Sequence, residues 1–286
     1  MKRQKIKIGL IAVMLSGLVF TGCNDNDEIQ EELKSEVIDV KTTEIQAEVD
    51  NASESVSVII EETYLNLESP ELKKTQTSKD RYLPDCVTIT VVLVQNMKTT
   101  TIDFGDGCEL RNGNFVSGKI ILNYQKDPEA LIKTIAYAFE DFYFNYKNIA
   151  GGGTILKERS NGSGNPQSTK TFDVTVTWPD ESFASKKGVK IREWIEGQGS
   201  GTWGDNVFLI TGHGTFTKKN GTLISTEIIE PLRRELACKF LVSGIVNLTK
   251  NEKTAILNYG DGSCDDLATI TINGNEREIH LGNRKR

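Results

Sequence analysis

Cys23 is the residue whose surroundings point most clearly to a particular chemistry. Four basic side chains lie at positions 2, 3, 5 and 7, and the apolar run Ile8–Phe20 follows them. This run is too short to cross a bilayer as a helix, but it has the length of the hydrophobic part of an export signal. The small residues Thr21 and Gly22 then lead directly to Cys23. The order of these features predicts an export signal that ends at the cysteine.

The segment Phe20-Thr21-Gly22-Cys23 resembles the bacterial lipobox. In that motif a lipid is attached to the cysteine sulfur, the signal is cut before the cysteine, and the new N-terminus is acylated, for example with palmitate. Phe20 stands where leucine is usual, and Thr21 stands where alanine or serine is usual. The resemblance implies that residues 1–22 are a lipoprotein signal peptide and that Cys23 is the lipid anchor. An ordinary secretory signal followed by an incidental cysteine is the alternative.

Acidic residues are concentrated soon after Cys23. Removal of residues 1–22 changes the formal charge from −6 to −10, and positions 24–71 hold fifteen Asp and Glu against two Lys. From position 72 onward, twenty-five acidic residues stand against twenty-eight basic ones. We therefore expect an acidic tether over residues 23–41. We expect no nucleic acid partner, because phosphate binding requires a basic face.

The first residues of this tether, Asn24-Asp25-Asn26-Asp27-Glu28, resemble a second short signal. Some Gram-negative lipoproteins carry such an acidic run after the lipidated cysteine, and it directs them to the outer face of the outer membrane. The resemblance implies a lipid-anchored protein of the outer membrane that faces the cell exterior, with the membrane as a partner through its N-terminal lipid. An anchor that faces the periplasm is the alternative.

The other four cysteines form two pairs, each placed symmetrically about a turn between two β-rich runs. Cys86 and Cys108 flank one such pair of runs, and Cys238 and Cys264 flank another. Four cysteines allow three connectivities. The symmetry places each pair at the open end of a hairpin, which favours the disulfides 86–108 and 238–264 in an oxidising compartment. We expect no metal site and no cofactor, because a CxxC motif is absent and the chain has only two histidines.

A helix and a long series of strands are expected after the tether. Between Thr42 and Leu67, apolar residues recur every three or four positions with acids on the other face, which predicts an amphipathic helix packed on the protein's own sheet. A helix–helix partner interface is the alternative. The apolar positions are Ile45, Val49, Ala52, Val56, Ile59, Ile60 and Tyr64.

Beyond Arg81 the chain consists of short β-rich runs separated by Gly, Asn and Asp, as in antiparallel hairpins. Asp127 resembles a helix start, but the aromatic residues up to Tyr146 favour a strand from about Lys133. The other runs are Val87–Val94, Thr99–Phe104, Gly118–Tyr124, Thr154–Glu158, Thr171–Trp178, Val189–Glu196, Asn206–Phe216, Thr222–Ile229, Cys238–Leu248, Lys253–Tyr259, Ala268–Ile272 and Arg277–Leu281. The fold class is therefore mainly β: an antiparallel meander, built as a large twisted sheet, a sandwich or a half-barrel, within one domain over residues 42–286.

Two parts of this domain, residues 86–124 and 238–281, share a motif that indicates an internal hairpin repeat. Ile102-Asp103-Phe104-Gly105-Asp106-Gly107-Cys108 aligns with Leu257-Asn258-Tyr259-Gly260-Asp261-Gly262-Ser263-Cys264, with one insertion. Together with Ile191–Gly197 and Cys264-Asp265-Asp266, these motifs resemble a family of uncharacterised β-rich lipoproteins of Gram-negative bacteria. The resemblance implies the same fold class and export, and it carries over no catalytic residue.

Residues that could carry catalysis or bind a metal have simpler explanations. The glycine-rich stretches Gly151–Gly153 and Gly197–Gly201 do not lie between a strand and a helix, so we expect loops rather than phosphate-binding sites. Sequence neighbours on a strand point to opposite faces, so we expect the pairs Asp180-Glu181 and Asp265-Asp266 to be poor candidates for glycoside hydrolysis. Asp261 and its neighbours lack the spacing of a calcium loop. His213 and His280 have no nucleophile nearby in the sequence, and we expect both to be structural or exposed.

Trp178, Trp194 and Trp203 are the candidate ligand-contacting residues, because exposed aromatic rings on a sheet can stack on sugars; burial in the core is the alternative. Our first hypothesis is a non-catalytic lipoprotein with a binding or structural role toward a glycan or protein ligand. A surface glycan-degrading enzyme, with two convergent carboxylates, is the second hypothesis. A carbohydrate-binding module that uses the three tryptophans is the third.

Overall fold

The computed structural model of the protein describes residues 38–68, 81–127 and 129–281. All of them belong to one compact unit, residues 37–286. The predicted signal peptide, Cys23 and most of the predicted tether lie outside the described residues. Within the described part, no helix combines the length and the apolar character needed to cross a membrane.

One long helix, α2 (Val40–Glu68), confirms the helix predicted over residues 42–67. Asp39 caps its N-terminus, because the Asp39 carboxylate accepts a hydrogen bond from the Thr42 backbone N–H over 2.6 Å. The helix therefore begins at the residue that follows the cap, at the end of the predicted tether.

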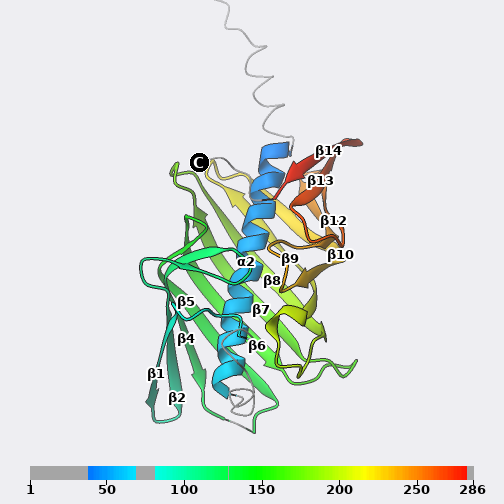
Figure 1. Ribbon diagram of the computed structural model, residues 1–286. Coiled ribbons are helices and arrows are strands. Elements are labelled where there is room, and N and C mark those ends of the chain that lie inside the picture. The colour runs from blue at the N-terminus through cyan, green and yellow to red at the C-terminus, as the bar shows by residue number, and fades with distance from the viewer. Residues whose placement is uncertain (1–37, 69–80, 128, 282–286) are drawn as a thin grey trace, which may run out of the picture. The chain divides into compact units, whose positions relative to one another are not determined.

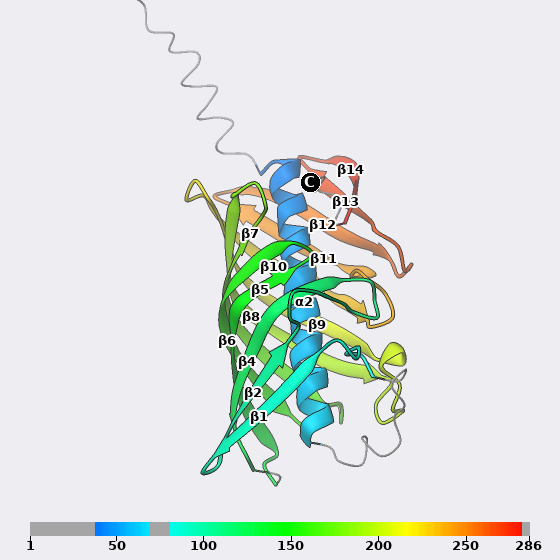
Figure 2. The ribbon, with the colours of Figure 1, turned by 60° about the vertical axis from the view of Figure 1, so that its left-hand side comes forward.

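Every strand in the described residues belongs to one antiparallel sheet, in which each main strand pairs with the next along the chain. The bounds are β1 (Thr88–Val94), β2 (Met97–Asp103), β3 (Cys108–Glu109), β4 (Phe115–Gln125), β5 (Ile132–Phe144), β6 (Lys147–Glu158), β7 (Gln167–Thr177), β8 (Phe183–Glu196), β9 (Val207–Lys218), β10 (Leu223–Glu235), β11 (Ser243–Lys250), β12 (Lys253–Asp261), β13 (Leu267–Ile272) and β14 (Asn275–His280), with a short 3-10 helix, η1 (Trp203–Asp205). The sheet is open and curves around α2 (Figure 1, Figure 2). The predicted meander is thus confirmed, and β5 confirms the strand predicted from Lys133.

The prediction of a loop at Gly151–Gly153 is wrong, because these glycines lie inside strand β6. Gly153 pairs with Phe172 of β7, and Phe172 pairs in turn with Gly188 of β8. A Cβ atom on Gly153 would lie 2.0 Å from the Thr171 carbonyl oxygen, and one on Gly188 would lie 2.3 Å from that of His213. Glycines in neighbouring strands therefore let the backbones approach closely and the sheet bend around the helix. By contrast, Gly197–Gly201 is a loop between β8 and η1, as predicted.

The helix is buried on its polar side as well as on its apolar stripe. Val56, Ile59 and Ile60 belong to the continuous hydrophobic core, and each fully buried side chain of this size contributes about 1.5–3 kcal/mol. Asp50 and Glu54, on the other side of the helix, are also at most 1% exposed. The apolar periodicity correctly predicts the packing of the stripe. It does not reveal that the acidic face is covered too, because the curved sheet contacts more than one side of the helix.

Basic residues on the concave face of the sheet neutralise this acidic face. Lys190 of β8 donates hydrogen bonds to Asp50 over 3.0 Å and to Glu54 over 2.8 Å, and Lys186 forms a further ion pair with Asp50. Arg192 donates to Glu61 over 3.2 Å. Burial acts to raise the pKa of Glu54, but the neighbouring cations, Lys190 foremost, outweigh it and lower this pKa to about 2. A buried ion-pair network of this kind favours one rotation and one axial position of the helix over others.

Both predicted disulfides, Cys86–Cys108 and Cys238–Cys264, are present. The first disulfide lies beside β1 and β2 at one end of the sheet. In the second, Cys238 precedes β11 and Cys264 follows β12, near the other end. The two motifs also share local structure. Asp103 accepts a hydrogen bond from the Gly105 N–H over 2.8 Å, and Asn258 accepts one from the Gly260 N–H over 3.0 Å.

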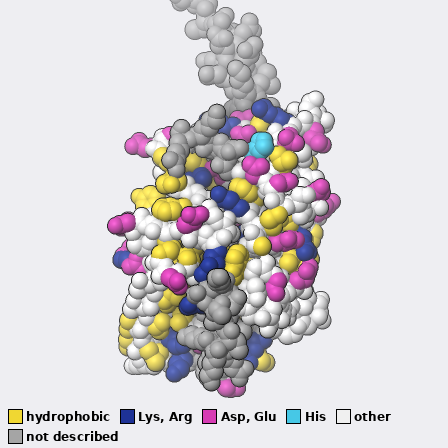
Figure 3. Space-filling view, viewed as in Figure 1, with side chains coloured by type: hydrophobic (Ala, Val, Ile, Leu, Met, Phe, Trp, Pro, Cys, Tyr) yellow, Lys and Arg dark blue, Asp and Glu magenta, His cyan; other side chains and the backbone are white. Residues whose placement is uncertain are grey.

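The two edges of the sheet differ in character. Strand β1 is exposed along its whole length, and hydrophobic side chains gather at the lower left of Figure 3, over β1 and β2. Strand β14 carries Glu276, Arg277 and Glu278, all exposed. Charged side chains of this kind protect an edge strand from pairing with other chains, whereas β1 has no such protection.

Candidate functional site

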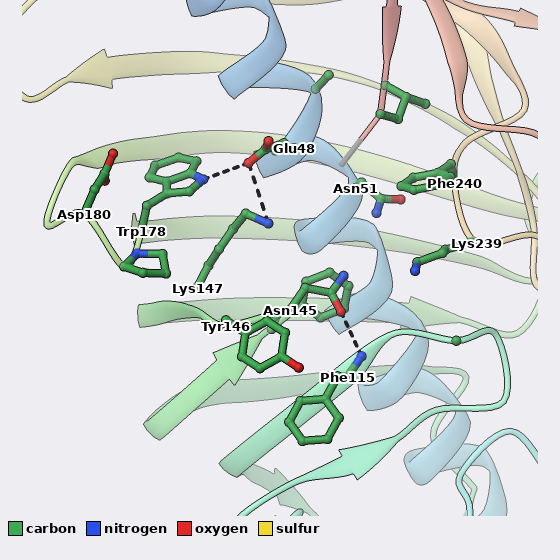
Figure 4. Close-up of a pocket in the computed structure, with 15 residues that line it drawn as sticks. Glu48, Asn51, Phe115, Asn145, Tyr146, Lys147, Trp178, Asp180, Lys239 and Phe240 are labelled. Carbon is green, nitrogen blue, oxygen red and sulfur yellow. Dashed lines mark hydrogen bonds and ion pairs between the residues drawn. The ribbon is translucent and has the colours of Figure 1, made fainter. Parts of the chain in front are cut away.

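A cleft with a volume of about 460 Å³ lies beside the N-terminal half of α2 (Figure 4). Five segments far apart in the sequence line it: α2, the region from β4 to β6, the turn after β7, the loop between β10 and β11, and Leu281 after β14. The polar and aromatic residues that line it include Glu48, Asn51, Tyr146, Trp178, Asp180 and Lys239. A cleft of this size can enclose a small organic ligand.

Aromatic rings form much of the wall. Phe115 and Tyr146 stack with ring centroids 5.5 Å apart and an interplanar angle of 17°. Tyr146 is 51% exposed, whereas Trp178 is only 5% exposed. Tyr146 therefore offers an accessible ring at the rim, while Trp178 forms part of the packed wall.

The tight turn between β5 and β6 holds Tyr146 in place. Asn145 and Tyr146 have φ values of 46° and 66°, a left-handed conformation that is uncommon for tyrosine and is typical of two-residue hairpin turns. The Asn145 carboxamide oxygen accepts a hydrogen bond from the Phe115 N–H over 2.8 Å, and its Nδ2 donates to Asn114 over 2.9 Å. These contacts fix the turn against β4 and so fix the direction of the Tyr146 ring.

Glu48 connects the helix to the aromatic wall. Its carboxylate accepts a hydrogen bond from the Trp178 Nε1 over 2.7 Å and lies 3.6 Å from the Lys147 Nζ (Figure 4). The sequence alone does not distinguish Glu48, because on a helix it is one acid among many. Only the position of Trp178, 130 residues away, distinguishes it.

Asn51, one helical turn after Glu48, lines the cleft and carries an unpartnered polar atom. The residue is 6% exposed, and its Oδ1 is buried without a hydrogen-bond partner. In Figure 4 its amide group lies toward Phe240 and Lys239, on the side of the cleft opposite Trp178. A buried acceptor without a partner costs about 1–3 kcal/mol, so a ligand or water that donates to it would be stabilised there.

The charged groups of the cleft are balanced in number. Glu48 and Asp180 contribute negative charge, and Lys147 and Lys239 contribute positive charge. Asp180 lies on the exposed turn after β7, where its Oδ1 accepts hydrogen bonds from the Ser182 N–H over 3.0 Å and from the Ser182 hydroxyl over 2.5 Å. The balance of charge favours a neutral ligand over a strongly ionic one.

Of the three predicted tryptophans, only Trp178 lines this cleft. Trp194 stacks on Phe208 with ring centroids 5.7 Å apart, and Trp203 contacts Tyr82 edge-on at 5.5 Å. Both line a smaller hollow beside the C-terminal end of α2. The three side chains are therefore divided between two places, and they are half-buried or buried rather than arranged as an exposed row.

The aspartates and histidines considered for metal binding have other roles. Asp261 and Asp265 accept backbone hydrogen bonds from Ser263 over 3.0 Å and from Leu267 over 2.9 Å, as expected for aspartates in turns. Asp266 lies 3.1 Å from the His280 Nδ1, and His213 is exposed on β9. Among the described residues, no group of three or more His, Cys, Asp or Glu could hold a metal ion.

Comparisons with known proteins give no relative from which a function can be transferred. No protein-family model, curated protein or solved structure matches this chain.

Proposed function

We propose that this chain is a lipid-anchored outer-membrane lipoprotein that binds a ligand, without converting it, on the outer face of the cell. The proposal for the anchor is supported by the sequence around Cys23, from the basic N-terminus through Ile8–Phe20 to the acidic residues that follow. Cys23→Ala is expected to abolish lipid labelling and to release the protein from the membrane fraction. A Cys23→Ala protein that is still lipid-labelled and membrane-bound would contradict the anchor.

The single observation that best supports a binding role is the cleft beside α2. It combines an accessible aromatic ring, Tyr146, with a buried and unpartnered amide acceptor, Asn51, in a neutral overall setting. Sugars present both apolar C–H faces, which pack on aromatic rings, and hydroxyl groups, which donate to and accept from amides and carboxylates. A neutral glycan is therefore the ligand class that we propose.

The binding proposal can be tested with the full chain on a glycan array, followed by titration calorimetry with any glycan that binds. Tyr146→Ala is expected to weaken binding at least about tenfold, because the accessible face of the cleft is lost. Tyr143→Ala is the matched control, since Tyr143, on β5, is also an exposed tyrosine but does not line the cleft. Equal loss in both variants, or no binding to any glycan, would contradict the proposal.

A glycan-degrading enzyme is the second candidate, because two carboxylates from distant segments, Glu48 and Asp180, line the same cleft. Glycoside hydrolysis requires such a pair. Each carboxylate is already hydrogen-bonded, Glu48 to Trp178 and Asp180 to Ser182, and this favours binding over catalysis. Release of reducing sugar by the wild-type chain, lost in both Glu48→Gln and Asp180→Asn, would establish the enzyme instead.

A further inference from the structure

Strand β1 is an unprotected edge of the sheet. Among the described residues it pairs only with β2, and all seven of its residues are exposed. Val92 is 53% exposed and Val94 is 65% exposed, and the strand Thr88–Val94 contains no charged residue. An edge strand of this kind presents backbone N–H and C=O groups along one side, ready to pair with another strand.

The chemistry of β1 restricts what can cover it. Both faces of the strand are apolar or carry only threonine hydroxyls, so a charged partner strand would lose solvation without gaining an opposite charge. The other edge of the same sheet, β14, carries Glu276, Arg277 and Glu278 and is therefore a poor match. A head-to-tail contact between β1 and β14 of different copies is disfavoured for the same reason. Such a contact would also give a ring or an open filament instead of a two-fold dimer.

We propose that β1 pairs antiparallel with β1 of a second copy of the chain, around a two-fold axis that passes beside Val91. In this register Val91 lies opposite Val91 of the partner subunit, Ile89 lies opposite Leu93, and Thr90 lies opposite Val92. Every cross-strand pair is then uncharged, and each apolar residue meets an apolar residue or a threonine. The sequence of the strand is thus complementary to itself, which is the condition for a closed two-fold interface.

The direction of the side chains agrees with this pairing. Val91 lies opposite Thr100 of β2, and Ile89 lies opposite Ile102. Thr100 and Ile102 are fully buried on the concave side, whereas Val91 is 42% and Ile89 is 37% exposed. The second β1 strand would cover these side chains, so the core that ends at β2 would continue across the axis. The hydrophobic group at the lower left of Figure 3 lies over these strands.

A charge-swap experiment tests the pairing and its register. The full chain, purified in mild detergent, is measured by light scattering with the detergent mass subtracted, and the wild-type chain is expected to have twice the mass of one chain. Val91→Lys and Val91→Glu are each expected to raise the dissociation constant at least about tenfold, because each places like charges directly opposite across the axis. An equimolar mixture of the two variants is expected to recover the dimer, because the introduced lysine of one chain then meets the introduced glutamate of the other.

Two controls make the outcome decisive. Glu276→Lys, on the opposite edge, is expected to leave the dimer intact. Circular dichroism and cooperative thermal unfolding verify that each variant folds, and recovery in the mixture is itself possible only for folded chains. A monomeric wild-type chain, single variants that are still dimeric, or a mixture that gives no heterodimer would each overturn the proposal.

Discussion

Asp50 on α2 accepts a hydrogen bond from the ammonium group of Lys190 on β8 over 3.0 Å, across 140 positions of the chain. The same carboxylate accepts hydrogen bonds from Gln46 over 2.7 Å and from the Tyr259 hydroxyl over 3.1 Å. Burial alone would raise the pKa of Asp50, but Lys186 and Lys190 outweigh it and hold this pKa well below its usual range. Asp50 therefore joins the helix to β8 and β12 through one buried, ionised group.

Asp50→Asn is expected to lower the free energy of unfolding by about 3–5 kcal/mol, because it leaves Lys186 buried without its carboxylate and leaves Lys190 with Glu54 alone. Denaturation in guanidinium chloride measures this change. Glu140→Gln is the control, since it removes a carboxylate from the exposed pair with Lys119, where we expect a loss below about 1 kcal/mol. Equal losses of unfolding free energy in the two variants would show that the buried ion pairs stabilise the fold no more than the exposed pair does.

Glu62 gives the unfolding free energy a dependence on pH with a defined sign. Burial raises the pKa of Glu62 from 4.5 to about 7. Between pH 4.5 and pH 7, Glu62 is therefore protonated in the folded state and ionised in the unfolded state. The stability contributed by this group falls as the pH rises through that range. The full loss corresponds to about 3 kcal/mol above pH 7.

The variant Glu62→Gln, which cannot lose a proton, isolates this effect. The difference in unfolding free energy between Glu62→Gln and the wild-type chain is expected to grow by up to about 3 kcal/mol in favour of the variant from about pH 4.5 to about pH 8. Glu276→Gln, on the exposed strand β14, is the control for removing a carboxylate that is not buried. A difference for Glu62→Gln that stays constant with pH would contradict the raised pKa.

Each disulfide is expected to stabilise its own end of the sheet. Cys86 and Cys108 are 22 positions apart, and Cys238 and Cys264 are 26 apart, so chain entropy assigns each bond about 3–4 kcal/mol. With both cysteines of the first pair replaced by serine, hydrogen exchange is expected to speed up in β1 and β2, while β11 and β12 stay protected. The matched replacement of Cys238 and Cys264 is expected to give the opposite pattern. Faster exchange throughout the sheet in either variant would argue against local bracing.

Strands β8 and β9 approach closely at Gly188, so we expect no larger side chain to fit at this position without strain. A Cβ atom there would lie 2.3 Å from the His213 carbonyl oxygen and 2.6 Å from the Gly214 Cα. Gly188→Ala is expected to cost at least about 1–3 kcal/mol of unfolding free energy, measured by thermal or chemical denaturation. Gly162→Ala is the control, because nothing lies within 4 Å of a Cβ at that position. If both substitutions are neutral, the curvature of the sheet does not depend on the glycine.

Much of the fold could be predicted from the sequence, because strands, turns and pairs of cysteines leave local signals. The short β-rich runs and the Gly, Asn and Asp residues between them predict the meander, and the symmetry of Cys86 and Cys108 about their turn predicts a disulfide that the structure contains. The apolar spacing from Ile45 to Tyr64 predicts the helix within two residues of its observed ends. The lipid anchor at Cys23 remains a prediction from the sequence.

Other features depend on what lies opposite a residue in space, and the tertiary structure alone decides them. Gly151–Gly153 reads as a loop until the neighbouring backbones of β5 and β7 are seen to approach it closely. Glu48 becomes part of a candidate site only because the curved sheet brings Trp178 to it. The burial of Asp50 and Glu54 has the same origin, since a helical pattern describes which residues share a face and not how many faces the sheet covers. The sequence thus determined the elements of this protein and its predicted export, and the curvature of the sheet decided which polar groups meet.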